Sequence, residues 1–439
     1  MASGQGRLPT GLLICLLALG ISGCWGSIET DDLAIIGSVG LDRVTPGKVL
    51  VSLEVSNPQA LAAGLGQQGV ANTVGWVLME EGSTVPNAIK NVQRRVPQKI
   101  FLGQVSTIVV GMNLARDGVQ PYLDYFAREN LVRRSIYITT CDSAAGLLQR
   151  PFIQNLPSLT LRGLVDATTR FSGKSVRVSL NEFLMKMAEP GIEPITMHTA
   201  GRKTQDTQVK KQGGEVRQAK PSASREQPLE SELNIPGMLP RDSPVLDPLS
   251  EYGTGEKLRG LTINLGIAAF RDDRLVGFLD GNDARGYLWV TARMVRGSIV
   301  EVPNPRREGV ILALLVRSVE SSLTPILDGK TPRMKVEVRL ELEMSQIPQD
   351  LYDDDLRLRQ EIQAAVNELV KGEMRKTLRT VQQEFRSDIF GFGQSLYRKY
   401  PKAWEAMASK WNEEIFPEVE VDLTVDSKIL ISNAVFRSK

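Results

Sequence analysis

The chain has 439 residues, of which 42% are hydrophobic and 24% charged, and its formal net charge at pH 7 is +2. So small a charge excludes the basic excess typical of a nucleic-acid-binding protein, and the length allows about two or three domains with cores of their own. The single histidine, His198, argues against a histidine-based metal site or a catalytic triad, so we expect neither a metal ion nor a cofactor.

Residues 1–23 have the features of a secretory signal peptide. The apolar run from Gly11 to Gly23 would rise about 20 Å as a helix, whereas a permanent span must cross roughly 30 Å of hydrocarbon. We therefore predict that this segment directs export and is then removed.

The signal segment ends in Ile21-Ser22-Gly23-Cys24, with small residues directly before a cysteine. This pattern resembles a lipobox, the site at which a bacterial lipoprotein is cleaved and a diacylglyceryl group is attached to the new N-terminal cysteine. A thiol is nucleophilic enough for that alkylation. We predict that Cys24 carries the lipid and holds the protein at a membrane. The alternative is an ordinary signal peptide with an incidental cysteine.

Cys141 is the one cysteine left once Cys15 departs with the signal and Cys24 is lipidated, so no intrachain disulfide is expected. It follows the apolar, alternating stretch Ser135–Thr140. That position favours a small buried side chain, and the alternative is a reactive thiol.

Residues 24–200 alternate predicted strands with predicted helices, which is typical of an α+β domain. Leu33–Asp42 and Lys48–Ser56 are expected to form a hairpin around a Thr45-Pro46-Gly47 turn, and Pro58–Thr73 is predicted as a mobile loop. The other expected elements are strands at Phe101–Gly111 and Ser135–Cys141 and helices at Thr84–Val96, Leu114–Arg128 (broken at Gly118 and Pro121), Ser143–Gln149 and Asn181–Ala188.

Residues 201–257 differ in composition from the rest of the chain. Much of this stretch is polar and charged, with few apolar side chains to bury. Such a segment cannot offset its chain entropy by forming a core, so we predict a disordered or poorly ordered linker.

Residues 258–439 form a predicted C-terminal α+β region, which could divide into two subdomains. A hairpin is expected at Leu261–Phe270 and Arg274–Leu279, with Asp272 and Asp273 shaping its turn. A short helix is expected at Asn282–Val290. Strands at Val310–Val319 and Arg333–Met344 continue a largely antiparallel sheet, and Val419–Ile431 is the last predicted strand. The predicted fold class is multi-domain α+β, with mixed or antiparallel sheets packed against helices.

A long amphipathic helix is the strongest helical signal in the chain. Apolar residues recur every three or four positions from Leu358 to Phe385. Three aspartates, Asp353 to Asp355, precede it. We interpret them as favourable charges at a helix start, and binding of a hard cation is the alternative.

Aromatic residues gather near the C-terminus, on helices expected around the Gly391-Phe392-Gly393 break and after Pro401. Two interpretations are open. The rings could line a pocket for an apolar or sugar ligand, or they could pack in the core, since Trp404 and Trp411 lie seven residues apart on one helix face. The residues concerned are Phe392, Tyr397, Tyr400, Trp404 and Trp411.

Several blocks together resemble the C-subunit lipoproteins of bacterial spore nutrient germinant receptors, the GerC family. The resemblance covers most of the mature chain and is most specific at its end. The blocks are Gly23-Cys24-Trp25, Gln93-Arg94-Arg95, Ala268-Ala269-Phe270, Asp388-Ile389-Phe390-Gly391-Phe392-Gly393, Tyr400-Pro401, Trp404, Trp411 and Phe416-Pro417. Gly26, Gln104 and Asn433-Ala434 depart from the family pattern.

The resemblance implies a non-enzymatic lipoprotein on the outer leaflet of the spore inner membrane. It implies work with a membrane-embedded A subunit and a transporter-like B subunit, in a receptor that responds to small nutrients. Trp25, Gly391, Phe392, Gly393, Trp404 and Trp411 become candidate interaction or structural residues.

We consider three possible functions for this protein. The first is a membrane-anchored receptor subunit required for the germinant response, and the alternative is a lipid-anchored module that captures the nutrient itself. An envelope hydrolase is disfavoured, because the chain has no Gly-x-Ser-x-Gly elbow and no His-Glu-x-x-His motif. We therefore expect a protein that is not an enzyme.

Overall fold

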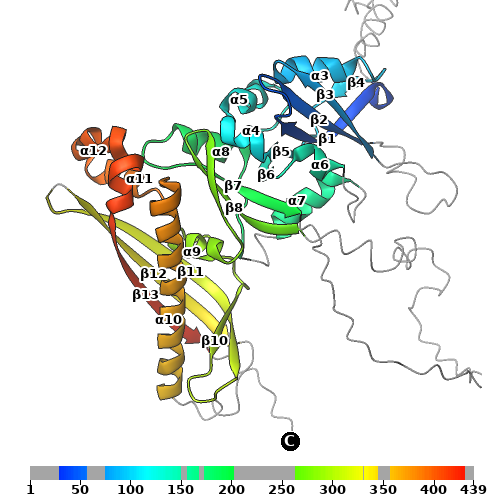
Figure 1. Cartoon of the computed structure of the whole chain (residues 1–439). Helices are drawn as coiled ribbons and strands as arrows, with labels where there is room; N and C mark the ends of the chain where they lie inside the picture. Colours follow the sequence, from blue (N-terminus) through cyan, green and yellow to red (C-terminus); the bar gives the residue numbers. More distant parts are fainter. Residues whose placement is uncertain are drawn as a thin grey trace, which may run out of the picture.

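The computed structural model describes residues 29–56, 75–149, 156–167, 173–201, 263–329, 331–344 and 356–430. Two sheets, one of nine strands and one of four, organise these residues (Figure 1). The predicted signal peptide with Cys24 and Trp25, the predicted loop at 58–73 and, apart from Gly201, the predicted linker at 201–257 lie outside the described residues.

The nine-stranded sheet has the order β3-β2-β1-β5-β6-β7-β8-β9, and a short strand, β4, pairs with the first residues of β1. The central strands β1, β5, β6 and β7 are parallel, and antiparallel strands extend the sheet at both ends. Every residue of β5 is buried, as expected for a parallel strand covered on both faces. The strands are β1 (Leu33–Asp42), β2 (Val49–Ser56), β3 (Gly75–Gly82), β4 (Lys99–Phe101), β5 (Thr107–Gly111), β6 (Tyr137–Cys141), β7 (Ile195–Gly201), β8 (Ile263–Arg271) and β9 (Arg274–Leu279).

Helices cover both faces of this sheet. On one face α6 and α7 pack their apolar side chains against Val109 and Cys141. On the other, α3, α4, α5 and α8 join the main core cluster with Ile108 and Val110. The helices are α3 (Val85–Gln93), α4 (Met112–Asp117), α5 (Gln120–Arg128), α6 (Ala144–Leu148), α7 (Pro157–Ala167) and α8 (Leu180–Ala188).

Most predicted elements of this part are confirmed. β1 and β2 form the expected antiparallel pair, Gly118 separates α4 from α5 with a φ of 125°, and Cys141 is buried. The predicted strand Phe101–Gly111 was wrong in extent, because the chain leaves the sheet between β4 and β5.

Three elements of this part of the chain were not predicted: β3, α7 and β7. The sequence did not predict β7, because polar side chains interrupt the apolar residues along it. Thr196 and Thr199 are nevertheless fully buried, since their hydroxyls donate to Thr140 on the neighbouring strand. His198 lies in the same strand, and burial lowers the pKa of its imidazole.

The four-stranded sheet has the order β10-β11-β12-β13. β11 and β12 are antiparallel as predicted, and β10, which was not predicted, pairs antiparallel with β11. β13 pairs with β12 in parallel, so the sheet is mixed. Along β12 buried residues alternate with more exposed ones, so one face is packed and the other solvated. The strands are β10 (Ile299–Pro303), β11 (Ile311–Leu327), β12 (Pro332–Met344) and β13 (Glu420–Leu430).

The predicted long helix is confirmed as α10 (Leu356–Arg379), which continues as a π-helical turn to Phe385. Its apolar stripe is buried beneath the four-stranded sheet and α9 (Asp283–Val290). The buried members of the stripe are Leu358, Ile362, Val366, Val370, Met374 and Leu378. Asp353 to Asp355 lie outside the described residues, so their interpretation stays a prediction.

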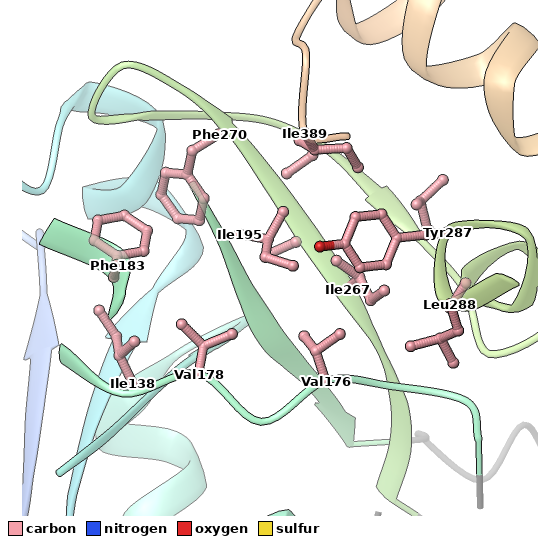
Figure 2. Packing of buried hydrophobic residues seen from close by; sticks show 14 of the residues in the cluster. Ile138, Val176, Val178, Phe183, Ile195, Ile267, Phe270, Tyr287, Leu288 and Ile389 are labelled. Carbon is pink, nitrogen blue, oxygen red and sulfur yellow. The ribbon is translucent and has the colours of Figure 1, made fainter. Parts of the chain in front are cut away.

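The two sheets share one core. β8 and β9 belong to the predicted C-terminal region yet complete the nine-stranded sheet, so that sheet runs across the predicted division of the chain. Figure 2 shows Ile195 and Ile267 from this sheet beside Tyr287 and Leu288 of α9, with Ile389 above them. The described residues end with α11 (Phe392–Lys399), α12 (Pro401–Met407), short helical turns to Glu418, and β13.

Candidate functional site

Asp388 is fully buried and accepts four hydrogen bonds. Its Oδ1 accepts from the backbone N–H groups of Gly391, at 2.9 Å, and Phe392, at 3.1 Å. Its Oδ2 accepts from the backbone N–H of Gly393, at 2.7 Å, and from Trp411 Nε1, at 2.9 Å. The carboxylate therefore satisfies the free donors at the start of α11 and also holds the indole that follows α12.

Two glycines make this arrangement possible. Gly391 has a φ of 79°, a left-handed conformation that a side chain would strain. A Cβ on Gly393 would lie 2.7 Å from the Trp404 ring and 2.8 Å from Trp411 Nε1. The Gly-Phe-Gly sequence thus lets the helix start approach both tryptophans closely.

The tryptophans form part of a buried aromatic cluster. Trp404 is 6% exposed and Trp411 3%, and their ring centroids lie 5.3 Å apart. Phe392 and Phe416 pack edge to face at 6.0 Å. Such contacts agree with the core interpretation of these rings. Tyr397, at 43% exposed, points out of the cluster.

Glu193 joins the same site from the other side. Its carboxylate accepts from the Asp272 backbone N–H and from Asn412 Nδ2, each at 2.6 Å. Its own N–H donates to the Asp388 carbonyl, and Asn412 Oδ1 accepts from the Asp388 N–H. The segment before β7, the β8–β9 turn and the C-terminal helices are therefore tied together. We call Glu193, Asp388, Trp411 and Asn412 the acidic junction.

Burial controls the protonation of the acidic junction. It raises the pKa of Glu193 to about 7, although the Asp272 and Asn412 donors oppose the shift. It raises the pKa of Asp388 to about 6, against four hydrogen bonds that favour the charged form. Two carboxyl groups in one buried site therefore titrate closer to neutral pH than ordinary carboxyls.

The structure brings five predicted residues together: Gly391, Phe392, Gly393, Trp404 and Trp411 all surround Asp388. Cys24 and Trp25 lie outside the described residues. Asp388 was part of the recognised motif but was given no role. It lies three residues before Gly391, the N-cap of α11, and so outside the position at which a capping side chain is recognised from sequence. Glu193 and Asn412 carried no signal in the sequence either.

A cavity of about 660 Å³ lies away from the acidic junction, between the chain around Val176 and the loop after α9. Arg177, Arg293 and Arg296 line it together with Glu182, which Arg293 contacts directly. None of the aromatic residues proposed for a pocket lines this cavity.

Within the described ranges, no group of three or more His, Cys, Asp or Glu side chains is placed to hold a metal ion. No helix in this part of the chain is long and apolar enough to cross a membrane.

Two family models match the chain, one in each half. Residues 26–198 match the model described as spore germination protein N-terminal domain, and residues 265–432 match spore germination B3/GerAC like, C-terminal. Spore germination protein KC of Bacillus subtilis (strain 168) is 22% identical over 428 residues, covering 95% of this chain and 94% of that protein. Spore germination protein YndF of the same organism is 19% identical and covers 96% of each chain. The crystal structure of the GerBC protein aligns over 89% of this chain and 96% of its own, at 14% identity and a TM-score of 0.48.

Proposed function

The chain belongs to the GerC family of spore germination proteins, and from this premise we propose that it is a lipid-anchored, non-enzymatic receptor subunit required for the response to nutrient germinants. The observation that carries the proposal is the order and extent of the match. The N-terminal family model matches the first half of the chain and the C-terminal model matches the second half. The match to spore germination protein KC covers nearly the whole length of that protein. A role in spore germination receptors is common to this family.

The proposed anchor is the diacylglyceryl group on Cys24, on the outer leaflet of the spore inner membrane. An anchored domain meets membrane-bound partners at a much higher effective concentration than a free one. The proposed partners are the membrane-embedded A subunit and the transporter-like B subunit. In this proposal the lipid places the two sheets beside those subunits.

The acidic junction supports a structural role for the C-terminal family motif. Asp388 is inaccessible to solvent, and each of its oxygens is occupied by two donors. A carboxylate held in this way orients the helices around it and has no free lone pair for acid–base chemistry on a substrate. We propose that it keeps the C-terminal helices in a fixed position relative to the nine-stranded sheet.

The membrane anchor can be tested with Cys24→Ala in the full chain, expressed in sporulating cells without the A and B subunits. The variant should move from the membrane to the soluble fraction, while a Cys141→Ala control should stay at the membrane. A variant that remains fully membrane-bound in the absence of partners contradicts the anchor.

The receptor role has a separate test. Spores that lack this chain should lose the response to the germinants of their receptor, and the parent chain should restore it. The A and B subunits should also be recovered with the tagged chain after crosslinking in spores. A normal response without the chain contradicts the role.

A second candidate function is direct capture of the nutrient, and the cavity near Arg293 is the observation that favours it. Its volume falls within the usual range for small-molecule sites, about 300 to 1,000 Å³. Calorimetric titration of the mature chain with active germinants would decide the matter. Heat that disappears in Arg293→Gln supports capture, and absence of heat across the whole panel rejects it.

A further inference from the structure

The cavity near Arg293 has two walls that lie far apart in the sequence. One wall is formed by residues 175–177, just before α8, and the other by residues 293–296, in the loop that follows α9. Glu182 of α8 and Leu288 of α9 complete the lining. The cavity therefore lies between a helix that covers the nine-stranded sheet and a helix that packs against α10.

The first wall is fixed to two strands of the nine-stranded sheet. The Ser175 hydroxyl donates a hydrogen bond to the Gly266 carbonyl of β8 at 2.5 Å. The Val178 carbonyl accepts from the Ile138 N–H of β6 at 3.1 Å. Arg177 lies between these two contacts, so its place at the cavity is fixed by the sheet.

The second wall is fixed at both of its ends. The Arg293 N–H donates to the Leu288 carbonyl of α9 at 2.9 Å, and the Gly297 N–H donates to the Val316 carbonyl of β11 at 2.7 Å. Arg296 lies within the loop that these bonds hold. A ligand therefore meets a site whose backbone is already formed, which lowers the entropic cost of binding.

The lining of the cavity is positively charged. It contains three arginines, and Glu182 is its one acidic side chain, so its net charge is +2. Glu182 contacts Arg293 directly, and Lys186 Nζ lies 3.7 Å from the Glu182 carboxylate. The negative charge is therefore already shared between two cations. Arg177 and Arg296 are exposed, and within the described residues neither forms an ion pair.

The cavity also has an apolar part. Val176, Leu288 and Met294 line it and are otherwise buried, at 2%, 0% and 7% exposure. Figure 2 shows Val176 on the segment before α8 and Leu288 on α9. The volume of about 660 Å³ is many times the roughly 30 Å³ that a water molecule occupies in the liquid. An inorganic anion would fill little of this space, whereas a ligand with a carbon chain would also cover the apolar side chains.

We propose that this cavity binds a small organic dianion, a dicarboxylate with a short apolar body, through Arg177 and Arg296. A guanidinium group pairs with a carboxylate through two parallel hydrogen bonds, which favours this group over other anions of the same charge. The inference names the ligand class for the second candidate function, and it rests on that function only for the identification of the ligand with the nutrient.

Binding of adipate to the purified mature chain tests the ligand class. The chain carries Cys24→Ala, so that no lipid is attached, and titrations are followed by saturation-transfer NMR of the ligand. We expect adipate to bind and its uncharged diamide, adipamide, not to bind. Hexanoate, which has one carboxylate, should bind at least about tenfold more weakly, because one charged pair is lost. Inorganic phosphate should also bind more weakly than adipate.

Substitution of the two unpaired arginines tests the site. Arg177→Gln and Arg296→Gln should each weaken adipate binding about tenfold, and the double variant about 100-fold. The matched control, Arg116→Gln with Arg398→Gln, removes two exposed arginines that do not line the cavity and should leave adipate binding unchanged. Urea denaturation of both double variants verifies that each is folded.

Four outcomes would overturn the proposal. They are no binding of adipate to the parent chain, equal binding of adipate and adipamide, binding of phosphate as tight as that of adipate, and equal loss of binding in the two double variants. The first shows that the cavity takes no dicarboxylate, the second and third that it does not select two carboxylates on a carbon chain, and the last that net charge alone attracts the ligand.

The response of spores to germinants separates this inference from the second candidate function. Spores that carry Arg177→Gln with Arg296→Gln are compared with spores that carry the matched control. A normal germinant response together with lost adipate binding would reject capture of the nutrient in this cavity and support the ligand class. A lost response with unchanged adipate binding would overturn the ligand class, because the two arginines would then act without holding a dicarboxylate.

Discussion

The nine-stranded sheet and the four-stranded sheet hold their helices in different ways. In the first, buried carboxylates on strands bind helix starts: Asp42 accepts from the Ala144 and Ala145 N–H groups at 2.9 and 2.7 Å. Glu54 accepts from the Ser158 N–H at 2.8 Å and its hydroxyl at 2.7 Å. In the second, α10 packs through a row of apolar side chains.

Buried carboxylates fix the positions of the helices that they bind, whereas apolar packing tolerates small shifts of a helix. A buried carboxylate needs its donors at fixed distances, and burial raises the pKa of both Asp42 and Glu54 despite those donors. An apolar stripe has no such directional requirement, so its stability is spread over many contacts. The acidic junction uses the first mechanism at the start of α11, between the two sheets.

Asp388→Asn should have the largest effect on stability. All four partners of Asp388 are N–H donors that cannot reverse their role, so an amide NH₂ would face one or two of them. We expect the free energy of unfolding to fall by about 3 to 4 kcal/mol, measured by urea denaturation. Asp426→Asn on the exposed side of β13 is the control and should change little. A loss below about 1 kcal/mol at Asp388 would contradict this account.

Gly286→Ala tests the close packing of α9 against α10. A Cβ on Gly286 of α9 would overlap the Glu373 carbonyl and the Thr377 hydroxyl of α10. Forcing the helices apart should lower the free energy of unfolding by about 2 to 3 kcal/mol. Gly372→Ala is the matched control, because a Cβ there meets nothing within 4 Å. That change should stabilise α10 by up to about 1 kcal/mol, and equal losses at both glycines would refute the packing argument.

The apolar packing of α10, which is spread over many residues, could be predicted from the sequence. The apolar positions of α10 repeat at helical spacing. Val366, Val370 and Met374 therefore indicate the buried face of the helix even when the residues that cover it are unknown. The β1–β2 hairpin was predictable for a similar reason, because its strands adjoin in sequence. Local order of this kind needs no long-range information.

The carboxylate contacts could not be predicted in this way. Glu54 and Ser158 are separated by 104 residues, and Glu193 and Asn412 by 219. A glutamate within a predicted strand gives no indication of which distant donor it will meet. Asp388 is the exception, because its partner amides are three to five residues away, and its motif was recognised although its role was not.

The acidic junction should make stability depend on pH. Because burial raises the pKa of Glu193 from 4.5 to about 7, the folded state keeps a proton that the unfolded state releases between these values. Stability therefore falls as the pH rises. Glu193 alone should lower the free energy of unfolding by about 2 kcal/mol between about pH 5 and pH 7.

Glu193→Gln should make this decline shallower in urea titrations across that range. Part of it should remain, because burial also raises the pKa of Asp388 to about 6. Asp273→Asn, in the same turn region, should leave the decline unchanged. An identical slope in the parent and in Glu193→Gln would show that Glu193 is already ionised in the folded protein at about pH 5.

Glu54→Gln should have the smallest effect and most sharply separates two kinds of carboxylate contact. One of the two donors to Glu54 is the Ser158 hydroxyl, which can turn and accept a hydrogen bond from the new amide, while the amide oxygen still accepts from the Ser158 N–H. The substitution also removes a buried charge whose pKa burial has raised. We expect the free energy of unfolding to change by less than about 1 kcal/mol, against about 3 to 4 kcal/mol for Asp388→Asn.

Adding Ser158→Ala removes the partner that can reverse its role, and should make Glu54→Gln distinctly destabilising. If Glu54→Gln alone lowers stability as much as Asp388→Asn, then the ability of a partner to reverse its role does not distinguish the two sites, and burial of the carboxylate alone must account for both.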